Sequence, residues 1–365
     1  MKIERVIISG GGSGGHIFPA IAIADELKRR NESVQILFVG AEGKMEMEKV
    51  PEAGYEIRGL KIVGFKRKLA LSNLLLPFKI IKSLLLAKRI LKEFNPQVVI
   101  GVGGYASGPT LKAATILKIP TLVQEQNSFP GKTNKILSKS VNKICVAYNG
   151  LERFFPANKI VITGNPTRKE MIETHGKEAE GYDYYGFDSS KRTILIIGGS
   201  LGARTLNDSI VNDLVKLKNA DVNVLWQCGK LYHKNLLQEL ENVDLGRVKL
   251  VKFIQRMDLA YAVSDIVISR AGAISVSELC LVKKPTILVP SPNVAEDHQT
   301  KNAMALVSKH AALMVRDVDA KEQLMRKAIE LLSNEKQLDE LANNIEKLGK
   351  PNATVDIVNE IEKIV

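Results

Sequence analysis

The stretch RVIISGGGSGGHIFPAIAIADELKRR, residues 5–30, joins a short apolar run to a glycine loop and then to a helical pattern. Its apolar start predicts a buried strand over 5–9, and the 3.6-residue spacing beyond the loop predicts a helix over 19–30. Glycines between a strand and a helix let backbone N–H groups approach a ligand, and the helix N-terminus adds partial positive charge. This stretch therefore predicts a phosphate site on an α/β sheet.

The same kind of loop occurs three times, at 10–16, 103–109 and 198–204, each time after an apolar run. Further strands are expected over 34–39, 98–102, 121–124, 143–147 and 159–162, and a second set over 193–197, 222–227, 248–253, 266–269, 286–289 and 312–315. Near-continuous apolar strands that alternate with helices are typical of parallel sheets, which bind ligands beyond the carboxyl ends of their strands. We expect two Rossmann-like domains facing a central cleft, over 1–165 and 166–350, with a final helix over 351–365 packing back on the first.

The composition of the chain limits the classes of partner and the compartment that can be expected. The 365 residues carry a formal net charge of +12, which indicates an acidic partner. Cys145, Cys228 and Cys280 are scattered, without metal or disulfide spacing, and predict buried reduced thiols. We find no secretory signal and no uncharged stretch long enough to cross a bilayer, so a cytoplasmic protein is expected.

The segment 66–92 holds eight basic residues, no acid and many leucines. Leucine and cation together favour a helix lying on an anionic membrane surface, with Lys79, Lys82, Lys88 and Arg89 as contacts. The alternative is an ordinary amphipathic helix on the sheet with a solvated basic face. Nucleic acid is not expected, because aromatic residues for base stacking are nearly absent there.

His16 stands at the mouth of the first loop and is the side chain best suited to accept a proton near neutral pH, although it could merely cap the helix. Polar residues 124–127 end a strand and suit a sugar. In the second half, the loop at Ser200 predicts another phosphate contact, and Glu278 could bind a ribose diol. The D-x-D spacing at Asp317 and Asp319 is discounted as a metal site because it lies far along the chain from every glycine loop, and Asp319 is read as an N-cap.

The motifs GGGSGGHIFP, GGYASGP, QEQN, GNPTR, GGSLGA, RAGAISVSE and HQTKNA occur in this order. Together they resemble the bacterial undecaprenyldiphospho-muramoylpentapeptide N-acetylglucosaminyltransferases. The resemblance implies a GT-B fold and inverting transfer of N-acetylglucosamine from UDP-N-acetylglucosamine to the C4 hydroxyl of lipid I, which gives lipid II for peptidoglycan. It further implies a peripheral enzyme at the cytoplasmic face of the cell membrane, with no cofactor and no metal.

The resemblance also implies roles for particular residues. His16 would be the base, with Glu125 as a second candidate, and Glu278 and the Ile254 backbone would hold ribose and uracil. The implied donor contacts are Ser13, Gly14, Gly15, Asn127, Arg168, Ser200, Ile254, Ala273, Ile274, Ser275, Val276, Ser277, Glu278 and Gln299. The implied acceptor-diphosphate contacts are Gly12, Ser13, Gly104, Tyr105 and Ser107. Two positions depart from the family pattern: Gln124 replaces a common histidine, and Thr300 stands where a second glutamine can occur.

Three other interpretations stay open from the residues alone. Gly10, Gly12 and Gly15 fit the G-x-G-x-x-G pattern of a nicotinamide oxidoreductase, which would leave the other two loops without a role. Another GT-B enzyme could act on a lipid such as diacylglycerol. A basic membrane-binding protein without activity is the third. Binding of UDP rather than NAD, and turnover of the sugar nucleotide, distinguish these interpretations.

Overall fold

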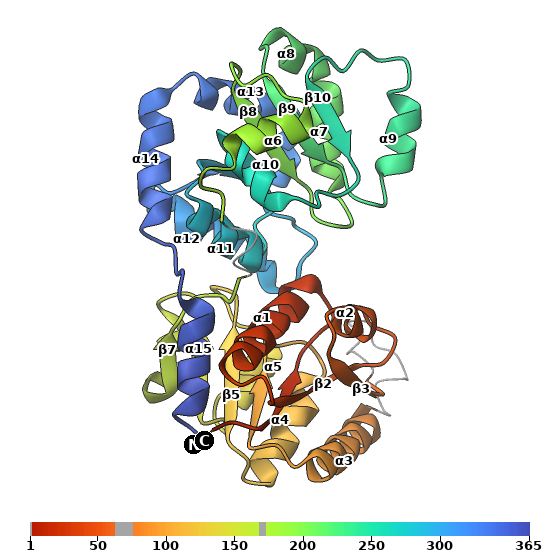
Figure 1. Ribbon diagram of the computed structural model, residues 1–365, viewed down its shortest axis with the longest axis vertical. Helices are drawn as coiled ribbons and strands as arrows, with labels where there is room; N and C mark the ends of the chain where they lie inside the picture. The colour runs from red at the N-terminus through yellow and green to blue at the C-terminus, as the bar shows by residue number, and fades with distance from the viewer. Residues whose placement is uncertain (1, 63–75, 168–172) are drawn as a thin grey trace. The chain divides into compact units, whose positions relative to one another are not determined.

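The computed structural model describes residues 2–62, 76–167 and 173–365 and divides into two compact units (Figure 1). Unit 1 comprises Met1–Thr167 and Lys350–Val365, and unit 2 comprises Arg168–Gly349. The sequence placed the division after residue 165.

Unit 1 is built on a seven-stranded parallel sheet in the order β3-β2-β1-β4-β5-β6-β7. The strands are β1 (Arg5–Ser9), β2 (Gln35–Ala41), β3 (Glu56–Leu60), β4 (Val98–Gly101), β5 (Thr121–Glu125), β6 (Lys143–Val146) and β7 (Ile160–Ile162). The helices are α1 (Gly14–Arg30), α2 (Glu46–Glu52), α3 (Leu76–Phe94), α4 (Ser107–Ile116), α5 (Lys132–Leu137) and α15 (Ala353–Glu362). The strand order reverses between β1 and β4, and ligands of such sheets bind at this switch point.

Two details of unit 1 differ from the sequence prediction. Strand β3 was not predicted, because Glu56 and Arg58 interrupt its apolar pattern, as is common at the edge of a sheet. Helix α1 begins at Gly14 rather than at Pro19, so the last residues of the first glycine loop form its first turn. In that turn the His16 N–H donates to the Ser13 carbonyl at 3.0 Å. The first N–H groups of a helix generally lack intrahelical acceptors, which suits an anion site.

Unit 2 repeats the arrangement with a six-stranded parallel sheet in the order β10-β9-β8-β11-β12-β13. Its strands are β8 (Thr193–Ile197), β9 (Asn223–Gln227), β10 (Val248–Val251), β11 (Ile266–Ser269), β12 (Thr286–Leu288) and β13 (Leu313–Met314). Its helices are α6 (Glu178–Tyr185), α7 (Arg204–Asn212), α8 (Leu214–Asn219), α9 (His233–Glu239), α10 (Met257–Val263), α11 (Ala273–Val282), α12 (His298–Val307), α13 (Ala320–Leu332) and α14 (Glu335–Glu346). The two predicted Rossmann-like sheets are confirmed.

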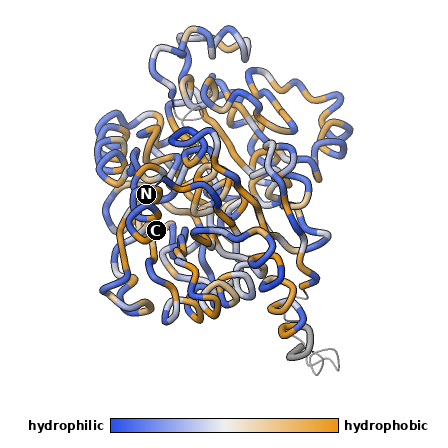
Figure 2. The backbone as a smooth tube through the Cα atoms, turned by 60° about the horizontal axis from the view of Figure 1, so that its bottom comes forward, coloured by the Kyte–Doolittle hydropathy of each residue, from blue (hydrophilic) through white to orange (hydrophobic). Residues whose placement is uncertain are grey.

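Each sheet is covered on both faces, so its central strands are apolar in both directions. In β1, the neighbours Ile7 and Ile8 point to opposite faces and are both fully buried. Figure 2 shows hydrophobic and hydrophilic residues alternating along the coiled helical segments of the backbone. The three cysteines are buried and unpaired, as predicted, and burial raises the pKa of the Cys145 and Cys280 thiols to about 12.

The last helix returns to unit 1. In Figure 1, α15 lies beside α1, and its Ile357, Val358 and Ile361 belong to the buried core that α1 also lines. Arg30 of α1 ties the two helices together, because its guanidinium contacts the Glu362 carboxylate at 2.9 Å and the Val355 carbonyl at 3.1 Å. The core of unit 1 is therefore completed by residues from the end of the chain.

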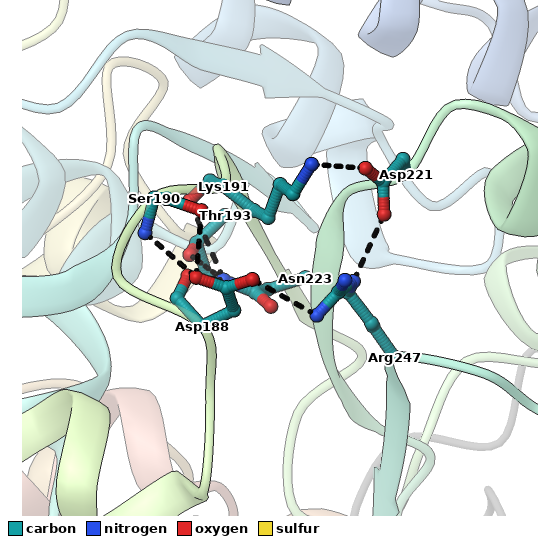
Figure 3. A network of polar contacts seen from close by, with 7 residues as sticks. All are labelled: Asp188, Ser190, Lys191, Thr193, Asp221, Asn223 and Arg247. Atoms are coloured by element: carbon teal, nitrogen blue, oxygen red, sulfur yellow. Dashed lines mark hydrogen bonds and ion pairs between the residues drawn. The ribbon is translucent and has the colours of Figure 1, made fainter.

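A polar network ties together the starts of β8, β9 and β10 (Figure 3). The Asn223 amide donates to the Asp188 carbonyl at 2.8 Å, and Arg247 bridges the carboxylates of Asp188 and Asp221 at 3.2 and 3.0 Å. Ion pairs and hydrogen bonds from Lys191 and Arg247 lower the pKa of Asp221. Because the glycine loop of unit 2 follows the opposite end of β8, we assign this network to structure rather than to ligand binding.

Candidate active site

The first glycine loop, residues 10–13, wraps around a buried carboxylate that the sequence did not single out. Glu46 is 1% exposed, and its two oxygens accept the N–H groups of Gly12 at 2.8 Å and Ala41 at 3.0 Å. A Cβ on Gly11 would lie 2.1 Å from the carboxylate carbon, so only glycine fits there. Since its N–H already donates to Glu46, Gly12 cannot offer it to an acceptor diphosphate, contrary to the sequence prediction.

His16 is held by the same loop. Its Nδ1 lies 3.0 Å from the Gly11 carbonyl oxygen and 3.4 Å from Ser13 Oγ. Because a carbonyl oxygen can only accept, we place the ring proton on Nδ1, which makes Nε2 the basic atom. A Cβ on Gly103 would lie 2.8 Å from Nε2, so the basic atom sits against the second glycine loop. This geometry suits a general base.

The first and second loops pack backbone against backbone at the switch point between β1 and β4. Gly104 has φ +86°, and a Cβ there would lie 2.4 Å from the Gly11 carbonyl oxygen. Tyr105, the next residue, is 55% exposed and remains a candidate contact. Ser107 does not: it is fully buried, and its hydroxyl lies 2.7 Å from the Ser9 carbonyl and 2.8 Å from the Gly103 carbonyl. The Ser107 hydroxyl therefore joins the end of β1 to the second loop and is not available to an acceptor diphosphate, and the predicted contact of this residue stays untested.

The polar residues 124–127 end β5 as expected, but the two glutamines point into the body of unit 1. Gln124 donates to Asn165 Oδ1 at 3.0 Å, and Asn165 donates to the Gln126 carbonyl at 3.0 Å. Gln126 in turn donates to the Val102 carbonyl at 2.7 Å. These buried amides link the ends of β4, β5 and β7 and stabilise the fold.

Glu125 is a poor candidate for the base. It is 2% exposed, and one carboxylate oxygen accepts the backbone N–H and side-chain amide of Asn127 at 3.0 and 3.2 Å. The other oxygen accepts the Gly131 N–H at 3.2 Å and the Asn134 amide at 2.8 Å. A buried carboxylate that already accepts four N–H donors is poorly placed to take a substrate proton, so the structure favours His16, and the role of Glu125 as base stays a prediction. Glu125 orients Asn127, which is half-buried just after the carboxyl end of β5.

Unit 2 contains a cavity of about 440 Å³ at the carboxyl ends of its strands. The third glycine loop and the first turn of α7 form one wall, and the loop that leads into α11 forms another. Two predicted donor contacts, Ser275 and Gln299, line this cavity. Gln299 is oriented by the Ser291 N–H, which donates to its amide oxygen at 2.8 Å. Ser200 is exposed in the same glycine loop.

Other predicted donor residues divide into accessible and enclosed side chains. Ala273 and Ile274 are partly exposed in the first turn of α11, whereas the Val276 side chain is buried in the core and cannot touch a ligand. Ser277 Oγ donates to the Ala273 carbonyl at 3.1 Å, and the buried Tyr261 hydroxyl lies 3.5 Å from a Glu278 carboxylate oxygen. Burial of Tyr261 raises its pKa well above the ordinary value.

Ile254 is 3% exposed, and its N–H donates to Gln227 Oε1 at 3.0 Å. The predicted uracil contact therefore cannot use this N–H while Gln227 holds it.

The position of Asp317 contradicts the argument by which the D-x-D pair was discounted. The D-x-D pair was set aside as remote from every glycine loop, yet Asp317 lines the unit 2 cavity and accepts the Thr205 hydroxyl at 2.9 Å. Asp319 stands at the N-cap of α13, but its carboxylate pairs with Arg316 at 2.6 Å and does not cap the helix. Within the described residues, no group of three or more His, Cys, Asp or Glu side chains could hold a metal ion.

Some predicted contacts fall outside what the structure describes. Arg168, the basic residues 66–68 and the Lys79 side chain lie outside the described residues.

The remaining predicted contacts of unit 1 are described by the structure. Ser13 and Gly15 are exposed at the start of α1, and Gly14 is partly exposed there. Lys82 is exposed, Lys88 is partly exposed, and Arg89 pairs with Glu93 at 2.7 Å. No helix among the residues placed by the structure is long and apolar enough to span a bilayer.

Comparison with known proteins places both units in one family. Residues 6–146 match the glycosyltransferase family 28 N-terminal domain, and residues 193–358 match the family 28 C-terminal domain. The chain belongs to glycosyltransferase family 28. The two matched regions contain the glycine loops of unit 1 and unit 2, and the family resemblance predicted from the sequence is confirmed.

Relatives of this family 28 chain span its full length. A Flavobacterium psychrophilum protein is 53% identical and covers 100% of the chain and 99% of its own length. A Parabacteroides distasonis protein is 52% identical, with coverage of 100% and 99%. Both are named UDP-N-acetylglucosamine--N-acetylmuramyl-(pentapeptide) pyrophosphoryl-undecaprenol N-acetylglucosamine transferase.

Solved structures agree with the family 28 assignment. The crystal structure of Acinetobacter baumannii MurG is 31% identical, covers 99% of both chains and superposes with a TM-score of 0.80. The predicted GT-B fold is thereby confirmed. A UDP-GlcNAc 2-epimerase from Neisseria meningitidis, bound to UDP-GlcNAc, is 17% identical with a TM-score of 0.66, and this likeness concerns the fold alone.

Proposed function

We propose that this family 28 enzyme transfers N-acetylglucosamine from UDP-N-acetylglucosamine to the C4 hydroxyl of lipid I, the undecaprenyl-diphosphate-linked muramoyl pentapeptide. The product is lipid II, which serves peptidoglycan synthesis and, through it, cell shape and division. The observation that carries the proposal is full-length identity of 52–53% to proteins named as this transferase. The motifs of both glycine-loop regions support the same assignment.

We assign the donor to the cavity of unit 2. The loop after β8 and the starts of α7 and α11 line this cavity. Backbone N–H groups at a helix N-terminus bind phosphates, and here they would bind the diphosphate of UDP. The same groups would stabilise the negative charge that builds on UDP as it leaves. Gln299 and Ser275 contribute polar contacts from the wall.

We assign proton transfer to His16 of unit 1. Its Nε2 accepts the proton of the C4 hydroxyl while the hydroxyl oxygen attacks C1 of N-acetylglucosamine. The bond from C1 to the diphosphate oxygen breaks, and UDP leaves from the opposite face, so configuration at C1 inverts. A single displacement of this kind requires neither a covalent nucleophile nor a redox cofactor. Tyr105 and Ser13 are the exposed residues best placed to contact the acceptor diphosphate.

The helix α3 supports contact with the lipid-bearing membrane. Ile80, Ile81 and Leu85 are each more than half exposed, and Lys82 and Lys88 stand among them. Exposed aliphatic residues interleaved with lysine favour binding to anionic bilayers. We propose that α3 places unit 1 at the cytoplasmic face of the membrane, where a polyprenyl-linked acceptor resides.

The membrane proposal is tested with vesicles of anionic and of zwitterionic lipid. Replacement of Lys82 and Lys88 by Glu should weaken sedimentation with anionic vesicles by about tenfold or more, at about 1 kcal/mol for each lysine and a similar penalty for each new acid. Lys234→Glu with Lys321→Glu, on exposed helices of unit 2, is the charge-matched control. Equal binding by both double variants would refute the assignment to α3.

The activity itself is tested by UDP release. The enzyme should release UDP from UDP-N-acetylglucosamine with a lipid I analogue and should not do so with diacylglycerol. Release with diacylglycerol alone would replace the proposed acceptor by a glycerolipid. Binding of NAD in place of UDP would instead support the oxidoreductase interpretation.

A further inference from the structure

Asp317 places a negative charge in the cavity that we assign to the donor diphosphate. Its side chain is 19% exposed and forms an ion pair with Arg270, which is 15% exposed. One carboxylate oxygen accepts the Thr205 hydroxyl at 2.9 Å, and the other meets Arg270 Nη1. Arg270 Nη1 also donates to the Val289 carbonyl at 3.0 Å.

These contacts join parts of unit 2 that are distant in the sequence. Thr205 is the second residue of α7, Arg270 follows β11 and precedes α11, and Asp317 follows β13. The N-cap residues of both helices, Ala203 and Gly272, make no side-chain cap hydrogen bond. The Asp317 carboxylate therefore connects two walls of the cavity. One wall contains the N-terminus of α7 and the other leads into the N-terminus of α11.

A carboxylate would by itself repel a diphosphate, so the presence of Asp317 in this cavity needs an explanation. The described residues lining the cavity include two arginines, and Arg204 is 80% exposed while Arg270 is largely enclosed. An enclosed guanidinium needs a partner, since an unpaired buried charge is strongly unfavourable. Asp317 supplies that partner and keeps the cation of Arg270 in the cavity.

We propose that Asp317 is a positioning residue for the donor diphosphate. By holding Thr205 and Arg270 together, it sets the spacing between the start of α7 and the loop before α11. The inference rests on the proposed function, because it takes the occupant of the cavity to be a nucleoside diphosphate. Small displacements of binding groups weaken the recognition of a charged ligand considerably.

The test compares calorimetric binding of UDP with that of uridine, which has the nucleoside and no phosphate. Asp317→Ala should weaken UDP binding about tenfold or more and leave uridine binding within about twofold, because only the diphosphate uses the positioned groups. Thr205→Val should act in the same direction, and Thr205→Ser should bind UDP as the parent does. The double variant should be no weaker than Asp317→Ala alone, since that variant already lacks the hydrogen bond with Thr205. Asp319→Ala, in the same turn, is the matched control.

Removal of an acid alone would favour an anion, so weaker binding of UDP together with unchanged binding of uridine indicates lost positioning. Unchanged or tighter UDP binding by Asp317→Ala would overturn the inference, as would an equal loss for UDP and uridine. If that variant does not fold, Thr205→Val decides the matter, because it leaves the carboxylate and its pairing with Arg270 in place. Failure of the unaltered enzyme to bind UDP would refute the proposed function and this inference together.

Discussion

Replacement of Glu125 by Gln separates a structural carboxylate from a catalytic one. In the native protein each carboxylate oxygen accepts two N–H donors, from Asn127 on one side and from Gly131 and Asn134 on the other. An amide keeps one oxygen and turns an NH2 group toward the other pair of donors. The variant therefore loses two hydrogen bonds and places donors against one another.

The size of the effect follows from these contacts. A hydrogen bond to a charged group contributes about 1.5–3 kcal/mol, so the loss of two lowers the free energy of unfolding by roughly 3–6 kcal/mol. Residues 127–129 are only half-buried, and water can replace part of what is lost, so we expect about 3 kcal/mol. For a domain of this size, that corresponds to a fall in melting temperature of roughly 6–12 °C.

Scanning calorimetry of Glu125→Gln, beside the exposed control Glu152→Gln, measures this change. Amide hydrogen exchange should rise over residues 126–134, where the carboxylate organises the loop. Turnover should fall by about tenfold through displacement of Asn127, with an unchanged pH profile. A melting temperature equal to that of the control, combined with turnover reduced by more than about a thousandfold, would refute the structural role and restore Glu125 as the base.

Three further predictions concern unit 1. His16→Ala should lower turnover by roughly 10²–10⁴-fold while UDP binding changes little, and a comparable loss in both quantities would remove its role as base. The hydrogen bond from Arg29 lowers the pKa of Glu26 to about 2, so Glu26 stabilises the fold fully above about pH 4.5 and progressively less as the pH falls toward 2. Urea unfolding at pH 6 and pH 3 should show that Glu26→Gln reduces the acid-induced loss in the free energy of unfolding by about 2 kcal/mol, which is the share of this carboxylate. Deletion of residues 350–365 removes three buried aliphatic side chains from the core, which together contribute roughly 5 kcal/mol or more, so circular dichroism should show unit 1 unfolded at 37 °C.

The strands and glycine loops were predictable because their signals are local. A strand buried on both faces is a continuous apolar run, and a glycine loop after it marks the ligand edge of the sheet. Strand β3 was missed because Glu56 and Arg58 belong to an edge that water reaches. The polar residues at the ligand edge were found by type, yet Ser107, Gln124 and Glu125 turned out to point inward.

The sequence by itself determined two Rossmann-like units, the edge of each sheet that carries the glycine loops, and His16 at the mouth of the first loop. Only the tertiary structure decided which polar side chains face that edge. It showed Glu46 inside the first loop, and Asp317 beside Thr205 although 112 residues separate them. The physical reason is that parallel strands bring their carboxyl ends together whatever their separation in the chain, while packing decides which way each side chain turns.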